Sequence, residues 1–309
     1  MSASIVKVEN LSHRYSVQWA IKDINFELTR NGIYGLLGSN GAGKSTIMNI
    51  MCGVIKQTQG EVYIQGVNLR QEPVKAKRHI GFLPQQPPLA TDLTVEEYLR
   101  HCANIRLMEA NAIKPAIDEV MSKVGVSHFS KRLIRNLSGG YQQRVGIAQA
   151  IIHKPRLVVM DEPTNGLDPN QLIEARKLIR EIAKDCTILL SSHVMSEIHL
   201  LCREVIMVES GRIVFSDSMD AFNNYLKPNT LLLKMENAPP TQDLLKVKGV
   251  SRAELLSDKQ FRIYFEGDQD ISERIVAASV EHDWRLREIN FEKGLLDDVF
   301  KQLSTQSHQ

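Results

Sequence analysis

The chain has 309 residues, of which 43% are hydrophobic and 24% are charged, and its net charge is +2. This length allows one large domain, or one domain of about 200 residues with a smaller companion. The small net charge excludes a strongly basic nucleic-acid or anionic-membrane surface at the level of the whole chain. No apolar run approaches the roughly 20 residues that cross a bilayer, and the first residues lack the apolar core of a signal peptide. We therefore expect a cytoplasmic protein unless a partner holds it at a membrane.

The four cysteines carry no metal or disulfide signal, because they are widely spaced and form no C-x-x-C pair. We expect them to be buried thiols in a reducing compartment; they are Cys52, Cys102, Cys186 and Cys202.

The first quarter of the chain is predicted to be rich in strands. Short apolar segments alternate there with polar turns, and Pro84 stops the last of them. The predicted strands are Val6–Leu11, Ile24–Thr29, Ile33–Leu37, Glu61–Ile64 and Ile80–Leu83.

The segment GSNGAGKST follows the third of these strands and opens a helical pattern, which is the setting of a phosphate-binding loop. Its glycines let successive backbone N–H groups converge on phosphate oxygens, and the helix that begins near Lys44 directs its positive end at the same anion. We expect Lys44 to reach the β- and γ-phosphates and Ser45 to offer its hydroxyl to Mg²⁺. The alternative is a glycine-rich turn that binds nothing. The candidate residues are Gly38, Ser39, Asn40, Gly41, Ala42, Gly43, Lys44, Ser45 and Thr46.

A helical insert is predicted over about residues 86–150. Thr94 and Glu97 have the spacing of a capping box, and the apolar residues that follow recur at helical spacing. A second helix ends at Gly125.

The string LSGGYQQR near the end of this insert is a second candidate anion site. Ser138 is a good N-cap residue, and Gly139 and Gly140 leave the first N–H groups of the next helix unobstructed. One ATP has a single γ-phosphate, which the first loop already holds. Two such loops in one domain are therefore explained if each ATP lies between two copies of the domain.

Acidic residues and a histidine follow two later strands. Asp161 and Glu162 come after the apolar run Leu157–Met160, and His193 comes just after the strand Thr187–Ser191. Parallel strands bind ligands at their carboxyl ends, so we expect Asp161 to hold Mg²⁺ and Glu162 to activate or orient a water. His193 is a candidate γ-phosphate contact, although a lone histidine is equally consistent with a turn residue.

Gln85 ends the strand before the insert and is a candidate to complete the Mg²⁺ coordination; by itself it is a loop residue. Helices Gln171–Ala183 and Met195–Leu201 alternate with the strands, which favours a parallel sheet, and Val205–Val208 with Arg212–Phe215 forms a closing hairpin.

Residues 227–309 are predicted to form an accessory α+β domain, after a first domain at 1–226. The predicted order is βαββαβ followed by a last helix, which resembles a split βαβ, ferredoxin-like sandwich. Its elements are Leu231–Lys234, Gln242–Lys246, Arg252–Leu256, Gln260–Phe265, Ile271–Glu281, Leu286–Phe291 and Leu295–Leu303.

In their order and spacing these motifs, with the Gly166–Pro169 turn, resemble the nucleotide-binding subunit of an ABC transporter over residues 5 to about 222. The phrases PTNGLDPNQ, SSHVMSEI and LLDDVF resemble the ATPase subunits of ABC-2 type exporters, closest to gliding-motility-associated and multidrug-type members. The implied fold is an α/β P-loop NTPase cassette with a helical insert. The implied activity is ATP hydrolysis with Mg²⁺, coupled to transport.

The resemblance also implies two cassettes that face each other head-to-tail. Ser138, Gly139 and Gly140 of one copy then meet the γ-phosphate held by Lys44 of the other, and Asp168 lies across the interface. Tyr15 matches the aromatic residue that stacks on adenine in this family; read alone, it is an ordinary strand aromatic. The usual signature is LSGGQ, so Tyr141 is a departure for which the next residue, Gln142, is a candidate substitute.

The implied partners are a second cassette and a separate membrane permease, which a groove near Gln85 and residues 84–105 would receive; nucleic acid is not expected as a partner. The candidate permease contacts are Leu89, Leu93 and Tyr98, although each is equally consistent with packing inside the insert itself. The expected location is the cytoplasmic face of a membrane. The alternative function is that of a translation- or DNA-associated ATPase of the same superfamily, but the two cassettes or long heptad repeats typical of those proteins do not occur in this sequence.

Overall fold

A computed structural model describes residues 4–225, 230–265 and 270–292. The chain divides into two compact units, residues 1–219 and 220–309. The predicted boundary between residues 226 and 227 lies outside the described residues.

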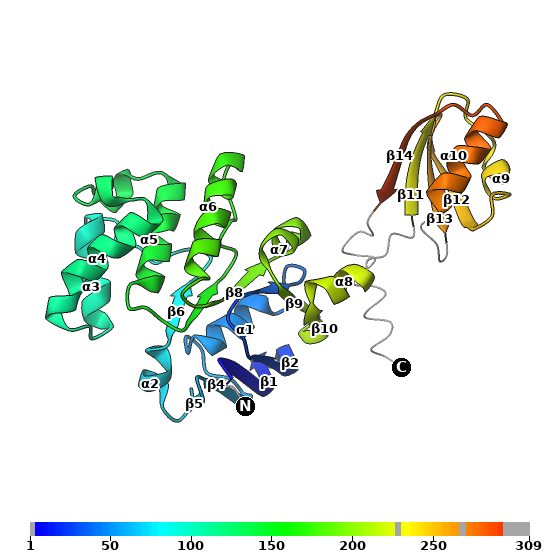
Figure 1. The fold of residues 1–309 in the computed structure, drawn as a ribbon. Helices are drawn as coiled ribbons and strands as arrows, with labels where there is room; N and C mark the ends of the chain where they lie inside the picture. The colour runs from blue at the N-terminus through cyan, green and yellow to red at the C-terminus, as the bar shows by residue number, and fades with distance from the viewer. Residues whose placement is uncertain (1–3, 226–229, 266–269, 293–309) are drawn as a thin grey trace. The chain divides into compact units, whose positions relative to one another are not determined.

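The first unit is built on two sheets (Figure 1). A six-stranded sheet has the order β10-β9-β3-β8-β7-β6, in which all neighbours are parallel except the β9–β10 hairpin. Its strands are β3 (Ile33–Leu37), β6 (Ile80–Leu83), β7 (Leu157–Met160), β8 (Thr187–Ser192), β9 (Glu204–Glu209) and β10 (Arg212–Ser218). An antiparallel sheet has the order β2-β1-β4-β5, from β1 (Val6–Tyr15), β2 (Gln18–Leu28), β4 (Gln59–Ile64) and β5 (Val67–Asn68).

Helix α1 (Lys44–Met51) lies between these two sheets. Its residues Ile47, Met48, Ile50 and Met51 belong to one buried cluster with side chains from both sheets. Strands β3, β7 and β8 are buried along their whole length, which explains their continuous apolar sequence. On the other face of β3, Gly35 leaves room for helix α7 (Met195–Leu201), since a Cβ there would lie 2.9 Å from Ile198. The phosphate-loop segment is thus fixed between two packed layers.

The predicted helical insert is present, with α3 (Val95–Ile105), α4 (Ala110–Val124) and α5 (Gly139–Ile151) packed together at one side of the unit (Figure 1). Both sides of the Thr94–Glu97 capping box are formed, and α4 ends at Gly125 with a left-handed φ of 73°. Two short 3₁₀ turns, Ser127–Phe129 and Ile134–Asn136, connect α4 to α5. The other helices of this unit are α2 (Pro73–Lys77) and α6 (Pro169–Ile182). Helix α8 (Met219–Tyr225) begins at the last residue of this unit, and its remaining residues belong to the second unit.

Strands β1 and β2 are longer than predicted. The first predicted strand ends at Leu11 and the second begins at Ile24, whereas β1 and β2 pair out to Tyr15 and Gln18. The pairing contains register shifts between Val8 and Arg14, and these interrupt the alternation of apolar and polar residues that a sequence pattern detects.

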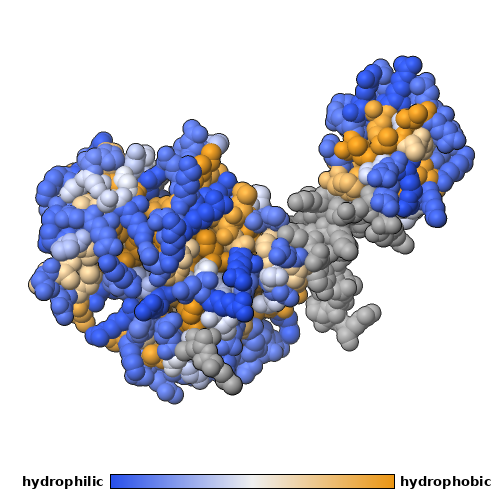
Figure 2. All heavy atoms as spheres, in the orientation of Figure 1, coloured by the Kyte–Doolittle hydropathy of each residue, from blue (hydrophilic) through white to orange (hydrophobic). Residues whose placement is uncertain are grey.

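The second unit has the predicted βαββαβ order. Its sheet runs β12-β13-β11-β14 with every neighbouring pair antiparallel, and its buried cluster includes Leu231, Phe261, Ile263, Ile275 and Trp284. The elements are β11 (Thr230–Met235), α9 (Thr241–Leu244), β12 (Val250–Ser257), β13 (Gln260–Phe265), α10 (Ile271–Glu281) and β14 (Leu286–Glu292). The predicted last helix, Leu295–Leu303, lies outside the described residues. On the face drawn in Figure 2, both units have a largely hydrophilic surface with smaller apolar patches.

Candidate nucleotide site

The phosphate-loop candidate occupies the turn between β3 and α1. Gly41 and Gly43 have left-handed φ angles of 84° and 108°. A Cβ on Gly43 would lie 2.5 Å from Ile21 and 3.0 Å from the carbonyl of Ala20, so both the φ angle and the space require glycine. Helix α1 begins directly at Lys44, and no side chain caps its first N–H groups. These donors are available to an anion.

Lys44 is buried at this turn and interacts with both the loop and the acidic strand end. Its Nζ donates to the carbonyls of Gly38 (2.8 Å) and Ser39 (3.1 Å), and it lies 3.8 Å from Glu162 Oε1. Burial lowers the pKa of Lys44, and the Glu162 carboxylate acts in the opposite direction. The ammonium group is therefore held at the loop by interactions that phosphate oxygens can replace.

The two acids and the histidine come together at the carboxyl ends of neighbouring strands β7 and β8. His193 Nδ1 donates to Glu162 Oε2 at 2.9 Å. Asp161 and Glu162 are only 5% and 9% exposed. Glu162 has a left-handed φ of 49°, which is uncommon for a residue with a side chain and marks a locally constrained backbone. Lys44, Glu162 and His193 thus form one connected group.

The oxygen donors present fit Mg²⁺ held partly by substrate. The Ser45 hydroxyl is exposed in the first turn of α1, and Asp161 Oδ1 accepts a hydrogen bond from Ser191 while Oδ2 accepts none from the described residues. Those residues contain no group of three or more His, Cys, Asp or Glu side chains suited to a metal. This set matches Mg²⁺, which is usually bound by one or two carboxylates, phosphates and water.

Three other candidates are open to solvent. Asn40 and Gln85 are exposed, and the Gln85 side chain has no hydrogen bond to another described residue. The chain carries Gln85 just past β6, whose Leu83 carbonyl accepts from the Asp161 N–H at 2.8 Å. Tyr15 is 53% exposed at the end of β1, with its ring 4.7 Å from His13 in an edge contact.

The remaining loop residues are fixed by the local packing. Ser39 Oγ donates to Glu209 at 3.1 Å, Ala42 is buried, and Thr46 is half-buried in the first turn of α1. Asp168 caps α6 by accepting from the N–H groups of Asn170 and Gln171, each at 2.9 Å.

The second anion candidate begins α5. Ser138 occupies the N-cap position, but its hydroxyl makes no capping hydrogen bond. Gly139 has open space where a Cβ would be, whereas a Cβ on Gly140 would lie 2.8 Å from the Gln171 side chain. Within the described part of the chain, no hydrogen bond or ion pair joins residues 138–140 to residues 38–46. One copy of the chain therefore does not link its two candidate anion sites directly.

The suggestion that Gln142 substitutes for the usual signature glutamine is not supported by its contacts. Its amide donates to the carbonyls of Ile134 (3.3 Å) and Leu137 (3.1 Å), so it holds the loop before α5. Tyr141, which occupies the glutamine's position, packs edge-to-face on Phe129 with centroids 4.7 Å apart.

Sequence reasoning missed several side chains that support the acidic segment. Gln143 donates to the carbonyl of Pro163 (2.9 Å), and Thr164 donates to Glu197 (2.5 Å). Ser191 Oγ lies between Asp161 and Glu162. The only signal for Ser191 in the sequence is its position two residues before His193.

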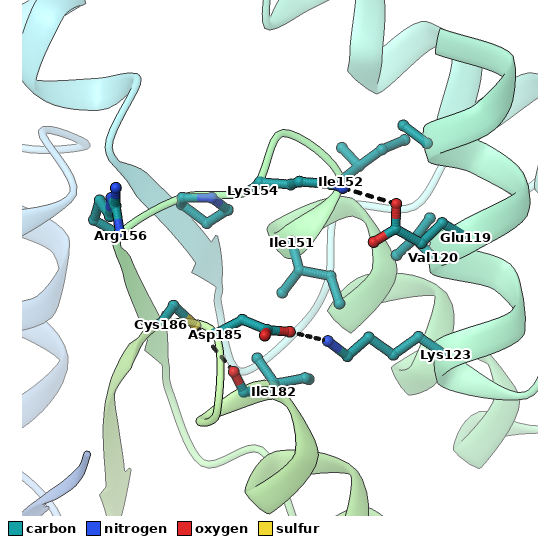
Figure 3. A pocket seen from close by; sticks show the side chains of 12 residues that line it. Glu119, Val120, Lys123, Ile151, Ile152, Lys154, Arg156, Ile182, Asp185 and Cys186 are labelled. Atoms are coloured by element: carbon teal, nitrogen blue, oxygen red, sulfur yellow. Dashed lines mark hydrogen bonds and ion pairs between the residues drawn. The ribbon is translucent and has the colours of Figure 1, made fainter. Parts of the chain in front are cut away.

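A separate cavity of about 400 Å³ lies between α4, the end of α5 and the α6–β8 turn (Figure 3). Ion pairs join Lys123 to Asp185 and Lys154 to Glu119 at its rim. None of its lining residues is a candidate nucleotide residue, so it is not the nucleotide site.

The fold and this site define a P-loop nucleoside triphosphatase. The family described as "ABC transporter" matches residues 21–165. The chain is 33% identical over 302 residues to the bacitracin transport ATP-binding protein BcrA of Bacillus licheniformis, covering 97% of this chain and 92% of that protein. It is 32% identical to the lantibiotic transport ATP-binding protein SrtF of Streptococcus pyogenes, covering 71% and 93%.

A solved dimeric structure of the ATP-binding cassette MJ0796, bound to ADP and Pi in a post-hydrolysis state, matches with a TM-score of 0.63 and 26% identity over 69% of this chain and 98% of that one. The chain belongs to the ABC transporter family, as an ATP-binding subunit that hydrolyses ATP to power transport. The translation- or DNA-associated alternative is not supported. Among the described residues, no helix is long and apolar enough to cross a membrane.

Proposed function

We propose that the group formed by Lys44, Asp161, Glu162 and His193 is the hydrolytic centre of this subunit. The observation that carries the proposal is that three side chains meet at one edge of the sheet. Lys44 Nζ lies 3.8 Å from Glu162 Oε1, and His193 Nδ1 lies 2.9 Å from Glu162 Oε2. In this proposal Lys44 binds the β- and γ-phosphates and the loop N–H groups hold their oxygens. Ser45 and Asp161 would hold Mg²⁺, which when bound would neutralise negative charge that develops on the phosphates.

Glu162 is the residue best suited to accept a proton from the attacking water. Its carboxylate is buried beside a cation and a histidine, so its orientation is fixed before the substrate arrives. In this proposal His193 donates through Nδ1 to Glu162, and its Nε2 donates to the γ-phosphate when both ring nitrogens carry a proton. Gln85 and Tyr15 are assigned by proposal to the Mg²⁺ shell and to the adenine ring, and the exposure of both side chains supports these roles.

A second cassette completes the site in this proposal. The open Ser138 hydroxyl and the unobstructed Gly139 would bind the γ-phosphate held by Lys44 of the other copy, with Asp168 near the interface. The absence of a direct link between the two anion sites in the described part of one chain, and the dimeric state of the similar solved cassette, support this arrangement.

A groove that combines apolar and basic side chains is the proposed permease contact. Its cavity of about 460 Å³ lies near β6 and α3, and its lining includes the basic residues Lys77, Arg78 and Arg106. Four apolar side chains in the lining, Val54, Val74, Ile105 and Leu107, are 61%, 65%, 65% and 72% exposed. The prediction that Tyr98 contacts the permease is wrong, because its side chain is 5% exposed and packs in the insert. The other two predicted contacts, Leu89 and Leu93, are half-buried. Exposed apolar side chains in a groove suit an amphipathic helix of a membrane protein.

We infer an exporter of the ABC-2 type, with this subunit at the cytoplasmic face of the membrane. The relatives named for bacitracin and lantibiotic transport support the exporter assignment. Changing Leu107 to Asp should leave ATP turnover of the isolated subunit unchanged and reduce its sedimentation with vesicles that contain the permease. Equal sedimentation of the variant and the wild type would contradict the groove assignment.

The direct test of the hydrolytic centre is Glu162→Gln. The amide keeps the size of the side chain and can still accept from His193, but it cannot take a proton from water. We expect phosphate release to fall by about 10²- to 10⁴-fold, while ATP binding is retained and an ATP-bound dimer accumulates in size-exclusion chromatography. Glu181→Gln, an exposed change of the same kind on α6, is the matched control. If the turnover of Glu162→Gln stays within about threefold of wild type, Glu162 is not the proton acceptor.

A further inference from the structure

The Ser191 hydroxyl lies between the two acids of the proposed hydrolytic centre. Ser191 is 0% exposed near the end of β8, the strand between β3 and β7. Its Oγ donates to Asp161 Oδ1 at 2.5 Å and accepts from the backbone N–H of Glu162 at 2.8 Å. One hydroxyl therefore uses its single proton on one acid and a lone pair on the next residue.

The two hydrogen bonds restrain the backbone N–H of Glu162 and the carboxylate of Asp161. Glu162 has the uncommon φ of 49°, a conformation that persists only when surrounding interactions enforce it. Its N–H is bonded by Ser191, and loss of that acceptor would leave a buried donor without a partner. The bond to Asp161 fixes one carboxylate oxygen and leaves Oδ2 without a hydrogen bond to the described residues.

The neighbouring serine shows that this arrangement is specific to Ser191. Ser192 is equally buried at 1% exposure, but its hydroxyl contacts Glu197 (3.2 Å) and accepts from the N–H of Val194 (3.0 Å). Its contacts therefore hold the turn after β8, and none of them reaches Asp161 or Glu162. If Ser191 were buried only for packing, there would be no reason for both hydrogen bonds of its hydroxyl to join residues of the proposed hydrolytic centre.

We propose that Ser191 is a positioning residue, which orients Asp161 for the nucleotide-bound cation and fixes the backbone of Glu162 for proton transfer. This proposal rests on the roles given above to Asp161 and Glu162. A side chain that orients a metal ligand typically changes metal affinity or activity by about 10- to 100-fold when it is removed.

The test is Ser191→Ala, which removes the hydroxyl without adding volume. We expect kcat to fall by about tenfold to a hundredfold with a much smaller change in KM for ATP. The Mg²⁺ concentration that half-saturates the Mg²⁺-dependent change in fluorescence of a labelled ATP analogue should rise by about tenfold. Affinity for the analogue without Mg²⁺ should not change. The fluorescence measurement does not depend on turnover.

Thr187→Val is the matched control, because Thr187 is a fully buried hydroxyl residue at the other end of β8. Its hydroxyl donates to Asn31 and bonds to no other side chain of the described residues. If Ser191→Ala and Thr187→Val show the same kcat and the same Mg²⁺ dependence, the proposal is wrong. Ser191→Cys, with a similar volume and a weakly bonding thiol, should reproduce the effect if the alanine variant fails to fold.

Failure of the underlying assignment would give a different result. If Glu162→Gln keeps wild-type turnover in the same assay, the proposed roles of the acids fail. If Glu162→Gln is inactive while Ser191→Ala matches the control in both measurements, those roles stand and only the role of Ser191 is refuted.

Discussion

His153, just after α5, should make the cassette less stable in acid. Its Nε2 donates to the carbonyl of Ile80 at 3.0 Å, and its buried Nδ1 has no hydrogen-bond partner in the described structure. Protonation would place a hydrogen on Nδ1 with no acceptor. Burial, with a smaller contribution from Arg106, lowers the pKa of His153 from 6.5 to about 4.

The sign and size of the effect follow from this depressed pKa. Near neutral pH the imidazole is neutral in both the folded and unfolded states, so it does not change the free energy of unfolding. Below about pH 6.5 the unfolded chain binds a proton that the folded chain excludes, and the free energy of unfolding falls by about 1.4 kcal/mol per pH unit. The loss stops near pH 4 at a total of about 3 kcal/mol.

The assay is urea unfolding of wild type and His153→Gln at about pH 7 and about pH 4.5, where the glutamine amide can still donate to Ile80. Comparing the two proteins cancels the contributions of the other titratable groups to the pH dependence of the free energy of unfolding. We expect the wild type to lose about 2 to 3 kcal/mol more than the variant between these pH values. His101→Gln, at an exposed position of α3, should lose as much as the wild type. Equal losses in the wild type and His153→Gln would refute the reasoning.

Two further predictions concern nucleotide binding. Lys44→Ala removes the buried cation of the phosphate loop and should lower ATP affinity by at least about tenfold in a fluorescence titration; undiminished affinity would count against the phosphate-loop assignment. Tyr15→Ala should weaken ATP binding by about 1–3 kcal/mol through lost stacking and change the free energy of unfolding by less than about 0.5 kcal/mol, since the ring is 53% exposed. Tyr15→Phe should bind like the wild type, and a loss in Tyr15→Phe equal to that in Tyr15→Ala would contradict stacking.

The parts of the site that the sequence predicts well depend on local pattern. A glycine-rich turn between an apolar strand and a helix has few possible structures, because Gly43 needs both a left-handed φ and space beside Ile21. The acids after β7 and His193 after β8 are predictable because neighbouring parallel strands end at the same edge. The order of strands and helices in the second unit is also predictable, because each element has its own apolar pattern along the sequence.

Contacts that depend on the separation of distant segments are not predictable from pattern. Ser191 acts on Asp161 only because β7 and β8 pair in one particular register, and no local feature of the sequence specifies that register to a single residue. The burial of Tyr98 depends on which face of α3 packs against the other helices of the insert, α4 and α5. Gln142 has carbonyl partners only because the loop at Ile134 and Leu137 folds back against the start of α5.

The central claim is that two copies share each nucleotide, and mixing two inactive variants tests it most directly. Lys44→Ala lacks the phosphate-binding cation, and Ser138→Arg places a bulky charge in the opposing loop. In a head-to-tail heterodimer of these two variants, one site receives an intact Lys44 from one chain and an intact Ser138 from the other. We predict that each variant alone shows little ATP turnover and that mixing them restores turnover. Two variants that are inactive alone and remain inactive when demonstrably mixed in one dimer would contradict the shared site.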